Sequence, residues 1–126
     1  MDRYVMYNPN PSQHRVGDCV IRAISKATGQ DWEDTYVGLS AYGFMLGDMP
    51  NANHVWGSYL RKKGYTRSII DDKGLDNYTV LDFCHDNPVG TYILAIDGHV
   101  VCVIDGCYYD SWDSGQEIPL YCWRQE

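Results

Sequence analysis

The stretch YILAIDGHVVCVIDGCYYDSW, residues 92–112, decides the fold class of this chain. Asp97-Gly98 and Asp105-Gly106 divide it, and such dipeptides favour two-residue hairpin turns. The segments between and beside the turns are rich in β-branched and aromatic residues, which is typical of strands: 92–96, 99–104 and 107–112. The stretch therefore predicts three consecutive antiparallel strands.

The chain before this stretch has a helical period instead. Apolar residues recur at helical spacing in the segments 19–28, about 32–44 and roughly 53–63, and a short strand at 65–70 and a brief helix at 80–85 follow. Asp18 is placed to cap the first helix and Gly29 to end it. With a closing strand at 118–123, helices come first and an antiparallel sheet second. This order predicts an α+β fold, formed as one domain over residues 1–126.

The second hairpin makes a prediction about the geometry of one pair of residues. A two-residue turn at its Asp-Gly dipeptide pairs Ile104 with Cys107. Counting outward along the two strands places His99 opposite Trp112, with Asp110 as its diagonal neighbour on the same face. A histidine and a carboxylate in this relation can form a hydrogen bond, and such a bond orients the histidine for catalysis.

Asp113 is the alternative partner of the histidine. In the register above it points to the other face of the sheet. A three-residue turn or a bulge near the dipeptide would exchange the faces of Asp110 and Asp113.

Cys19 is the candidate nucleophile because it lies at the start of the first predicted helix. Unpaired backbone N–H groups and the helix dipole favour an anion in the first turn. The anion here would be the thiolate, which is the form of cysteine that attacks a carbonyl carbon.

The order of these residues along the chain resembles that of the papain-like cysteine peptidases. The features that carry the resemblance are Gln13, Cys19, His99 and Asp110-Ser111-Trp112. In that superfamily a glutamine six residues before the nucleophile supplies an oxyanion-hole donor, and the third catalytic residue often lies in Asn-Ser-Trp. An aspartate in that position is usual in smaller bacterial relatives, such as the peptidases that process bacteriocin leaders. The chain resembles the small bacterial or phage type of the superfamily, which is similar to those peptidases and to NlpC-like peptidases.

The resemblance implies a role for each residue. Cys19 would be the nucleophile, His99 the base and Asp110 the residue that orients it, while Gln13 would stabilise the oxyanion and Trp112 would cover the histidine–aspartate bond. The implied fold is papain-like, with the helix that carries the nucleophile packed on the C-terminal sheet.

The expected function is that of a thiol hydrolase that cleaves an amide, peptide or isopeptide bond of a peptide or protein substrate through a Cys19 thioester. Transfer of the acyl group to an amine is one alternative. Another is a catalytically silent binding or inhibitory module of the same fold, for example a phage protein that acts on a host target.

Composition excludes several other classes of function. A formal net charge of −7 disfavours nucleic acid as a partner. The sequence contains no apolar run of about 20 residues, so no membrane span is expected. The N-terminal segment lacks the pattern of a signal peptide. Five cysteines without close paired spacings predict neither a disulfide framework nor a metal site, and no cofactor is implied. We therefore expect a reduced, cytoplasmic protein. The resemblance to small members of the superfamily favours a bacterial or phage origin.

Overall fold

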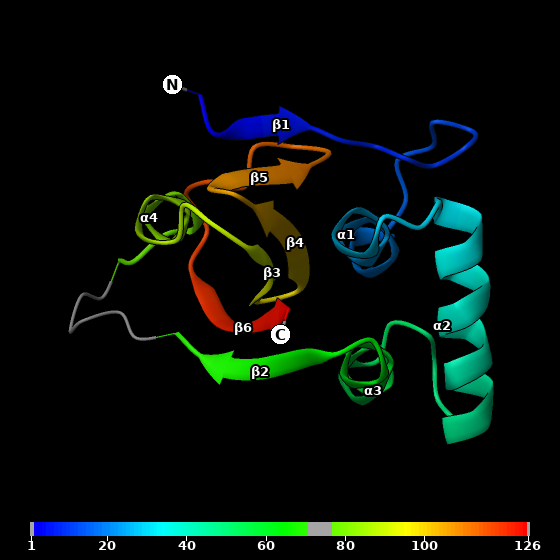
Figure 1. Cartoon of the computed structure of the whole chain (residues 1–126). Coiled ribbons are helices and arrows are strands. Elements are labelled where there is room, and N and C mark those ends of the chain that lie inside the picture. The colour runs from blue at the N-terminus through cyan, green and yellow to red at the C-terminus, as the bar shows by residue number, and fades with distance from the viewer. Residues whose placement is uncertain (1, 71–76, 126) are drawn as a thin grey trace.

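The computed structural model describes residues 2–70 and 77–125, and within these ranges the chain folds into four helices and one six-stranded sheet (Figure 1). The elements in chain order are β1 (Tyr4–Met6), α1 (Cys19–Thr28), α2 (Trp32–Leu46), α3 (Asn53–Lys62), β2 (Tyr65–Ile69), α4 (Val80–Asp86), β3 (Thr91–Ile96), β4 (His99–Ile104), β5 (Cys107–Asp110) and β6 (Pro119–Gln125). The α+β prediction is confirmed, and the predicted segment ends differ from the observed ones by at most two residues.

The strand order in the sheet is β1-β5-β4-β3-β6-β2. Four of the five strand pairs are antiparallel, but β1 runs parallel to β5, with Tyr4 paired to Tyr108. The prediction of a purely antiparallel sheet is therefore wrong at this edge, and the sheet is mixed. The physical reason is that β1 has only three residues, which is too short for a period-2 pattern to stand out.

Helices cover both faces of the sheet. Helices α1, α2 and α3 lie on one side of it and α4 on the other (Figure 1). Alternate residues of β3 accordingly enter two separate cores, Ile93 and Ala95 with the first three helices, and Leu94 and Ile96 with α4. Burial on both faces explains why the central strands are continuously apolar rather than alternating.

Both predicted hairpin turns are present. Ile96 pairs with His99 across the first turn and Ile104 pairs with Cys107 across the second. Asp105 and Gly106 both have positive φ, 50° and 77°, as a type I′ turn requires. The β4–β5 ladder ends at Cys102 and Tyr109, before the expected pairing of His99 with Trp112.

The helix ends follow local capping chemistry, with one exception. Thr79 and Asp82 form a reciprocal capping box at the start of α4, and Gly29 ends α1 with a φ of 74°. Asp18 occupies the N-cap position of α1, but its side chain does not cap the helix. That part of the prediction is wrong, because the carboxylate is engaged by two other side chains, which are described below.

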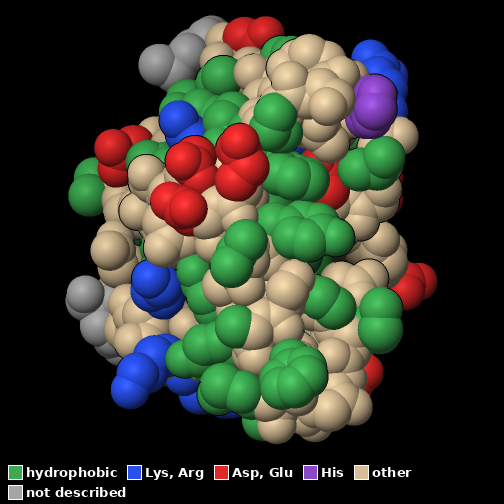
Figure 2. Space-filling view, turned by 90° about the vertical axis from the view of Figure 1, so that its right-hand side faces the viewer, with side chains coloured by type: hydrophobic (Ala, Val, Ile, Leu, Met, Phe, Trp, Pro, Cys, Tyr) green, Lys and Arg blue, Asp and Glu red, His purple; other side chains and the backbone are tan. Residues whose placement is uncertain are grey.

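Helix α2 is apolar around most of its circumference, although only Thr35, Leu39 and Gly43 of it are buried. Figure 2 shows hydrophobic side chains gathered down its outer face, and Phe44 is 89% exposed. Tyr36 of the same helix is 48% exposed. None of the helices in the described part of the chain combines the length and the apolar content needed to cross a membrane.

Candidate active site

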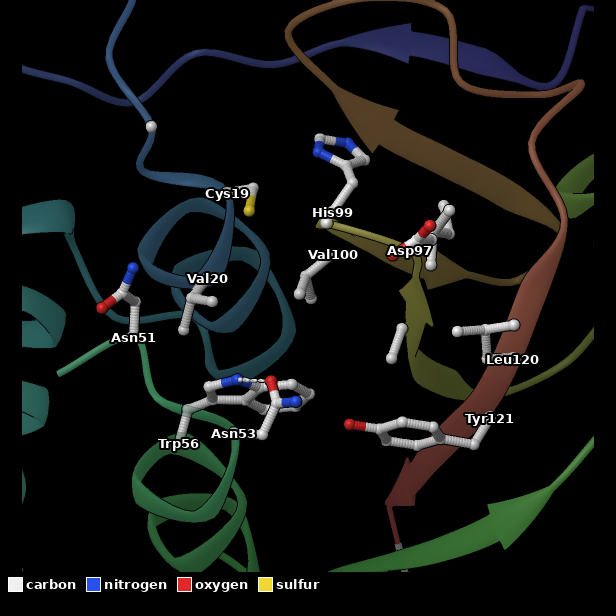
Figure 3. Close-up of a pocket in the computed structure, with 14 residues that line it drawn as sticks. Cys19, Val20, Asn51, Asn53, Trp56, Asp97, His99, Val100, Leu120 and Tyr121 are labelled. Carbon is white, nitrogen blue, oxygen red and sulfur yellow. Dashed lines mark hydrogen bonds between the residues drawn. The ribbon is translucent and has the colours of Figure 1, made fainter. Parts of the chain in front are cut away.

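Cys19 opens helix α1 and lines two cavities at the protein surface. One cavity, of about 330 Å³, is lined by Cys19, His99, Trp56 and Tyr121 among others. Figure 3 shows the thiol and the imidazole on one side of it and the two aromatic rings on the other. The second cavity, of about 310 Å³, is lined by Cys19, His99 and Trp112 among others. Cys19 and His99 therefore belong to the lining of both cavities, and a ligand in either cavity can contact them.

His99 and Asp110 form the predicted hydrogen bond, with 2.7 Å between Nε2 of the imidazole and Oδ2 of the carboxylate. Because Nε2 is engaged in this way, Nδ1 is the ring nitrogen that remains for the thiol of Cys19. The Trp112 ring lies against the imidazole, with 4.8 Å between the ring centroids. The structure therefore brings together four of the residues singled out from the sequence.

The electrostatics of the pair favour a thiolate and an imidazolium. Burial opposes ionisation of Cys19, but a hydrogen bond with His99 and its charge, the backbone N–H of Val100 and the charge of Arg22 bring its pKa below the ordinary value. Burial also lowers the pKa of His99, but the hydrogen bonds and charges of Asp110 and Cys19 outweigh this and raise it to about 9. Each partner thus stabilises the charged form of the other.

Asp110 is fully buried, and its carboxylate oxygens accept four hydrogen bonds. Besides His99, the donors are the Arg22 guanidinium at 3.0 Å, the Ser114 hydroxyl at 2.6 Å and the Ser111 backbone N–H at 2.8 Å. Burial alone would raise the pKa of this carboxyl, but the bonds from His99 and Ser114 and the charges of His99 and Arg22 lower it. The carboxylate is therefore held ionised and in one orientation.

Arg22 was not singled out from the sequence, yet it connects the site to the body of the protein. It is only 4% exposed and bridges Asp110 to Asp18, whose oxygen lies 2.6 Å from the guanidinium. Asp18 also accepts a hydrogen bond of 2.9 Å from the indole of Trp32 on α2. The signal available in the sequence was the four-residue spacing of Asp18 and Arg22, which favours an ion pair on a helix. The link to Asp110 had no local signal.

Gln13 does not join the site. It is exposed, has a φ of 57°, and its side-chain amide donates to the carbonyl oxygen of Asn10 at 3.1 Å. It lines neither of the two cavities at Cys19. The expected oxyanion role of Gln13 thus has no support in this arrangement, because the turn at Asn10 directs the amide back onto its own loop. The amide side chains that do line the cavities are those of Asn8, Asn51 and Asn53.

Asp113, the alternative partner of the histidine, also lies elsewhere. Its carboxylate accepts hydrogen bonds from the hydroxyl of Tyr108 and, at 3.0 Å, from the backbone N–H of Gly115. The alternative is therefore wrong, since the two-residue turn sets the register that directs Asp110, and not Asp113, to His99.

Chemically, the arrangement offers a nucleophile, a proton carrier and an orienting anion. Among residues 2–70 and 77–125, no three histidine, cysteine, aspartate or glutamate side chains are grouped so as to hold a metal ion.

Comparison of the chain with family models, with curated proteins and with solved structures gave no match. The geometry of the site therefore carries the functional argument.

Proposed function

We propose that the protein is a thiol hydrolase that cleaves an amide or isopeptide bond of a peptide or protein through a thioester on Cys19. The observation that carries the proposal is the placement of Cys19, beside His99 and its hydrogen-bonded partner Asp110, in the lining of surface cavities. A helix that begins with the nucleophile and packs against the strand with the base also supports a papain-like fold.

In the first half of the reaction the Cys19 thiolate attacks the carbonyl carbon, and the carbonyl oxygen becomes an oxyanion. His99 then protonates the departing amine through Nδ1, so the C–N bond breaks and an acyl thioester remains on the sulfur. The backbone N–H of Cys19, in the first turn of α1, is a donor available to the oxyanion.

In the second half, neutral His99 takes a proton from water, and the resulting hydroxide attacks the thioester. The acid product leaves, and the thiolate and imidazolium are restored. Asp110 keeps the ring oriented throughout and stabilises its positive charge. Cys19 must stay reduced to act as a nucleophile. We therefore propose that the protein acts in a reducing compartment, the cytoplasm.

Selective alkylation tests the proposal before any substrate is known. We expect iodoacetamide at mildly acidic pH to modify Cys19 selectively, because its pKa is lowered while burial raises the pKa of Cys84 and Cys122. His99→Ala should abolish this selectivity. Peptide mapping by mass spectrometry reads out the sites, and a peptide library with Cys19→Ala as control reads out turnover. Uniform slow labelling of all cysteines without turnover would instead support a binding module.

The two aspartates provide a matched pair of variants. Asp110→Asn should lower the rate of turnover by at least about a hundredfold, because the histidine loses its orienting anion. Asp113→Asn should change the rate by less than about threefold, since Asp113 contacts Tyr108 and Gly115 instead. Equal losses in both variants would contradict the assignment of Asp110. Circular dichroism spectra of both variants control for folding.

A further inference from the structure

A third cavity adjoins the candidate active site. It has a volume of about 300 Å³ and lies between α3, β2 and β6, with Arg61, Arg67 and Trp123 in its lining. Two further lining residues, Asn53 and Tyr121, also line the cavity that contains Cys19. The two cavities therefore lie next to each other and share part of their lining.

The two arginines of this cavity are held in place by aromatic rings. The guanidinium of Arg67 lies 4.2 Å from the centroid of the Tyr121 ring, and that of Arg61 lies 5.0 Å from the centroid of the Trp123 ring. Neither forms an ion pair with any residue in the described part of the chain. Contact with a ring on one side leaves N–H donors of each guanidinium group for a ligand.

Trp123 forms an aromatic wall of the cavity. It is only 3% exposed, and its indole N–H, which has no hydrogen-bond partner among the described residues, is shielded from the surface. A ligand in the cavity would therefore contact the ring of Trp123, and the donors available to it include those of the two arginines.

The charges around this cavity favour an anion. The described residues of its lining include Arg61 and Arg67, and none of these described residues is an aspartate or a glutamate. His54, also in the lining, is paired with Asp48 at 2.7 Å. The whole chain carries a net charge of −7, so an acidic ligand would be repelled at long range. At physiological salt that repulsion is screened beyond about 8 Å, and the local arginines then dominate.

We propose that the cavity lined by Arg61 and Arg67 is an oxyanion-binding subsite for an acidic side chain of a peptide. The anion is a carboxylate of aspartate or glutamate, or the phosphate of a phosphorylated residue, since both match the donors of paired guanidinium groups. That this peptide is the substrate cleaved at Cys19 rests on the function proposed above.

The test measures binding rather than turnover. The full chain with Cys19→Ala is titrated against three fluorescent short peptides of matched sequence, which carry glutamate, phosphoserine or glutamine at one position, and fluorescence anisotropy gives the Kd. We expect the glutamate or the phosphoserine peptide to bind about tenfold tighter than the glutamine peptide. Which of the two binds tighter identifies the source of the anion.

Two variants show whether the arginines are responsible. Arg61→Gln combined with Arg67→Gln should remove the preference for the acidic peptide and leave the affinity for the glutamine peptide unchanged. Lys62→Gln is the matched control, because Lys62 carries the same charge beside Arg61 but does not line the cavity. It should change the Kd by less than about twofold. Thermal unfolding checks that each variant folds, and Arg67→Gln alone, at an exposed position, serves if the double variant does not.

The outcomes of this test separate the two proposals. If the acidic peptides bind no tighter than the glutamine peptide, or if Lys62→Gln weakens binding as much as the arginine variants do, the subsite is refuted even where turnover is observed. Selective binding that depends on the arginines, together with uniform slow alkylation of all cysteines in the wild-type chain, would support the subsite and contradict the hydrolase.

Discussion

Replacing Arg22 with methionine removes the cation that joins the buried carboxylates of Asp18 and Asp110. Methionine replaces the aliphatic stem of the arginine side chain but lacks the guanidinium, so the ion pairs of 2.6 Å to Asp18 and 3.0 Å to Asp110 are lost. All three side chains are nearly or fully buried, so water cannot replace the lost partner without opening the fold.

The size of the effect follows from what each carboxylate retains. Asp110 keeps three donors, from His99, Ser111 and Ser114, whereas Asp18 keeps only the indole of Trp32 among the side-chain donors described. Breaking a buried ion pair costs about 3–5 kcal/mol, and we expect a loss in that range. Most of it should arise at Asp18, so adding Asp18→Asn should recover roughly 1–2 kcal/mol.

Urea unfolding at pH 7, followed by circular dichroism, measures the free energy of unfolding of each variant. Lys26→Met is the matched control, because Lys26 lies one turn further along α1 and contacts the ring of Tyr109 at 4.4 Å. We expect it to cost less than about 1 kcal/mol. If Arg22→Met costs no more than this control, the buried bridge does not stabilise the fold and the reasoning is refuted. Should Arg22→Met fail to fold, Arg22→Lys provides a milder comparison.

Three further predictions concern pH, the indole beside the histidine and the helix on the opposite face. Since the fold raises the pKa of His99 from its ordinary value of 6.5 to about 9, the stability from its protonated form is fully present below pH 6.5 and declines as the pH rises through about 9. The rate of peptide hydrolysis should fall over the same alkaline range, because the amine then loses its proton donor, and a rate that stays constant to pH 10 would contradict the mechanism. Trp112→Ala should lower kcat/KM about tenfold by opening the histidine–aspartate bond to water, with little change in the urea midpoint, and an unchanged kcat/KM would exclude this role. Thr79→Ala should lower the free energy of unfolding by about 1 kcal/mol through loss of the capping box, as measured in urea, while leaving Cys19 alkylation unaffected.

Much of the candidate site was accessible from the sequence because hairpin geometry is local. Once the turn at Asp105-Gly106 has two residues, the pairing of Ile104 with Cys107 is determined, and counting along the strands brings His99 to Asp110. Helix α1 was equally accessible, because its apolar spacing and the glycine at its end operate over only ten residues. The position of Cys19 in the first turn follows from the same local pattern.

The parts that the sequence did not predict depend on contacts between distant segments. Arg22 and Asp110 are 88 residues apart, and only the packing of α1 against the sheet brings the guanidinium to the carboxylate. The parallel edge strand β1 likewise depends on a distant contact, because it pairs with β5 about a hundred residues further along the chain. Turn geometry and helical periodicity act within a few residues, so the sequence by itself determined the hairpins, the first helix and the histidine–aspartate pair. Buried charge pairing and edge-strand placement depend on the assembled surfaces, so only the tertiary structure decided them.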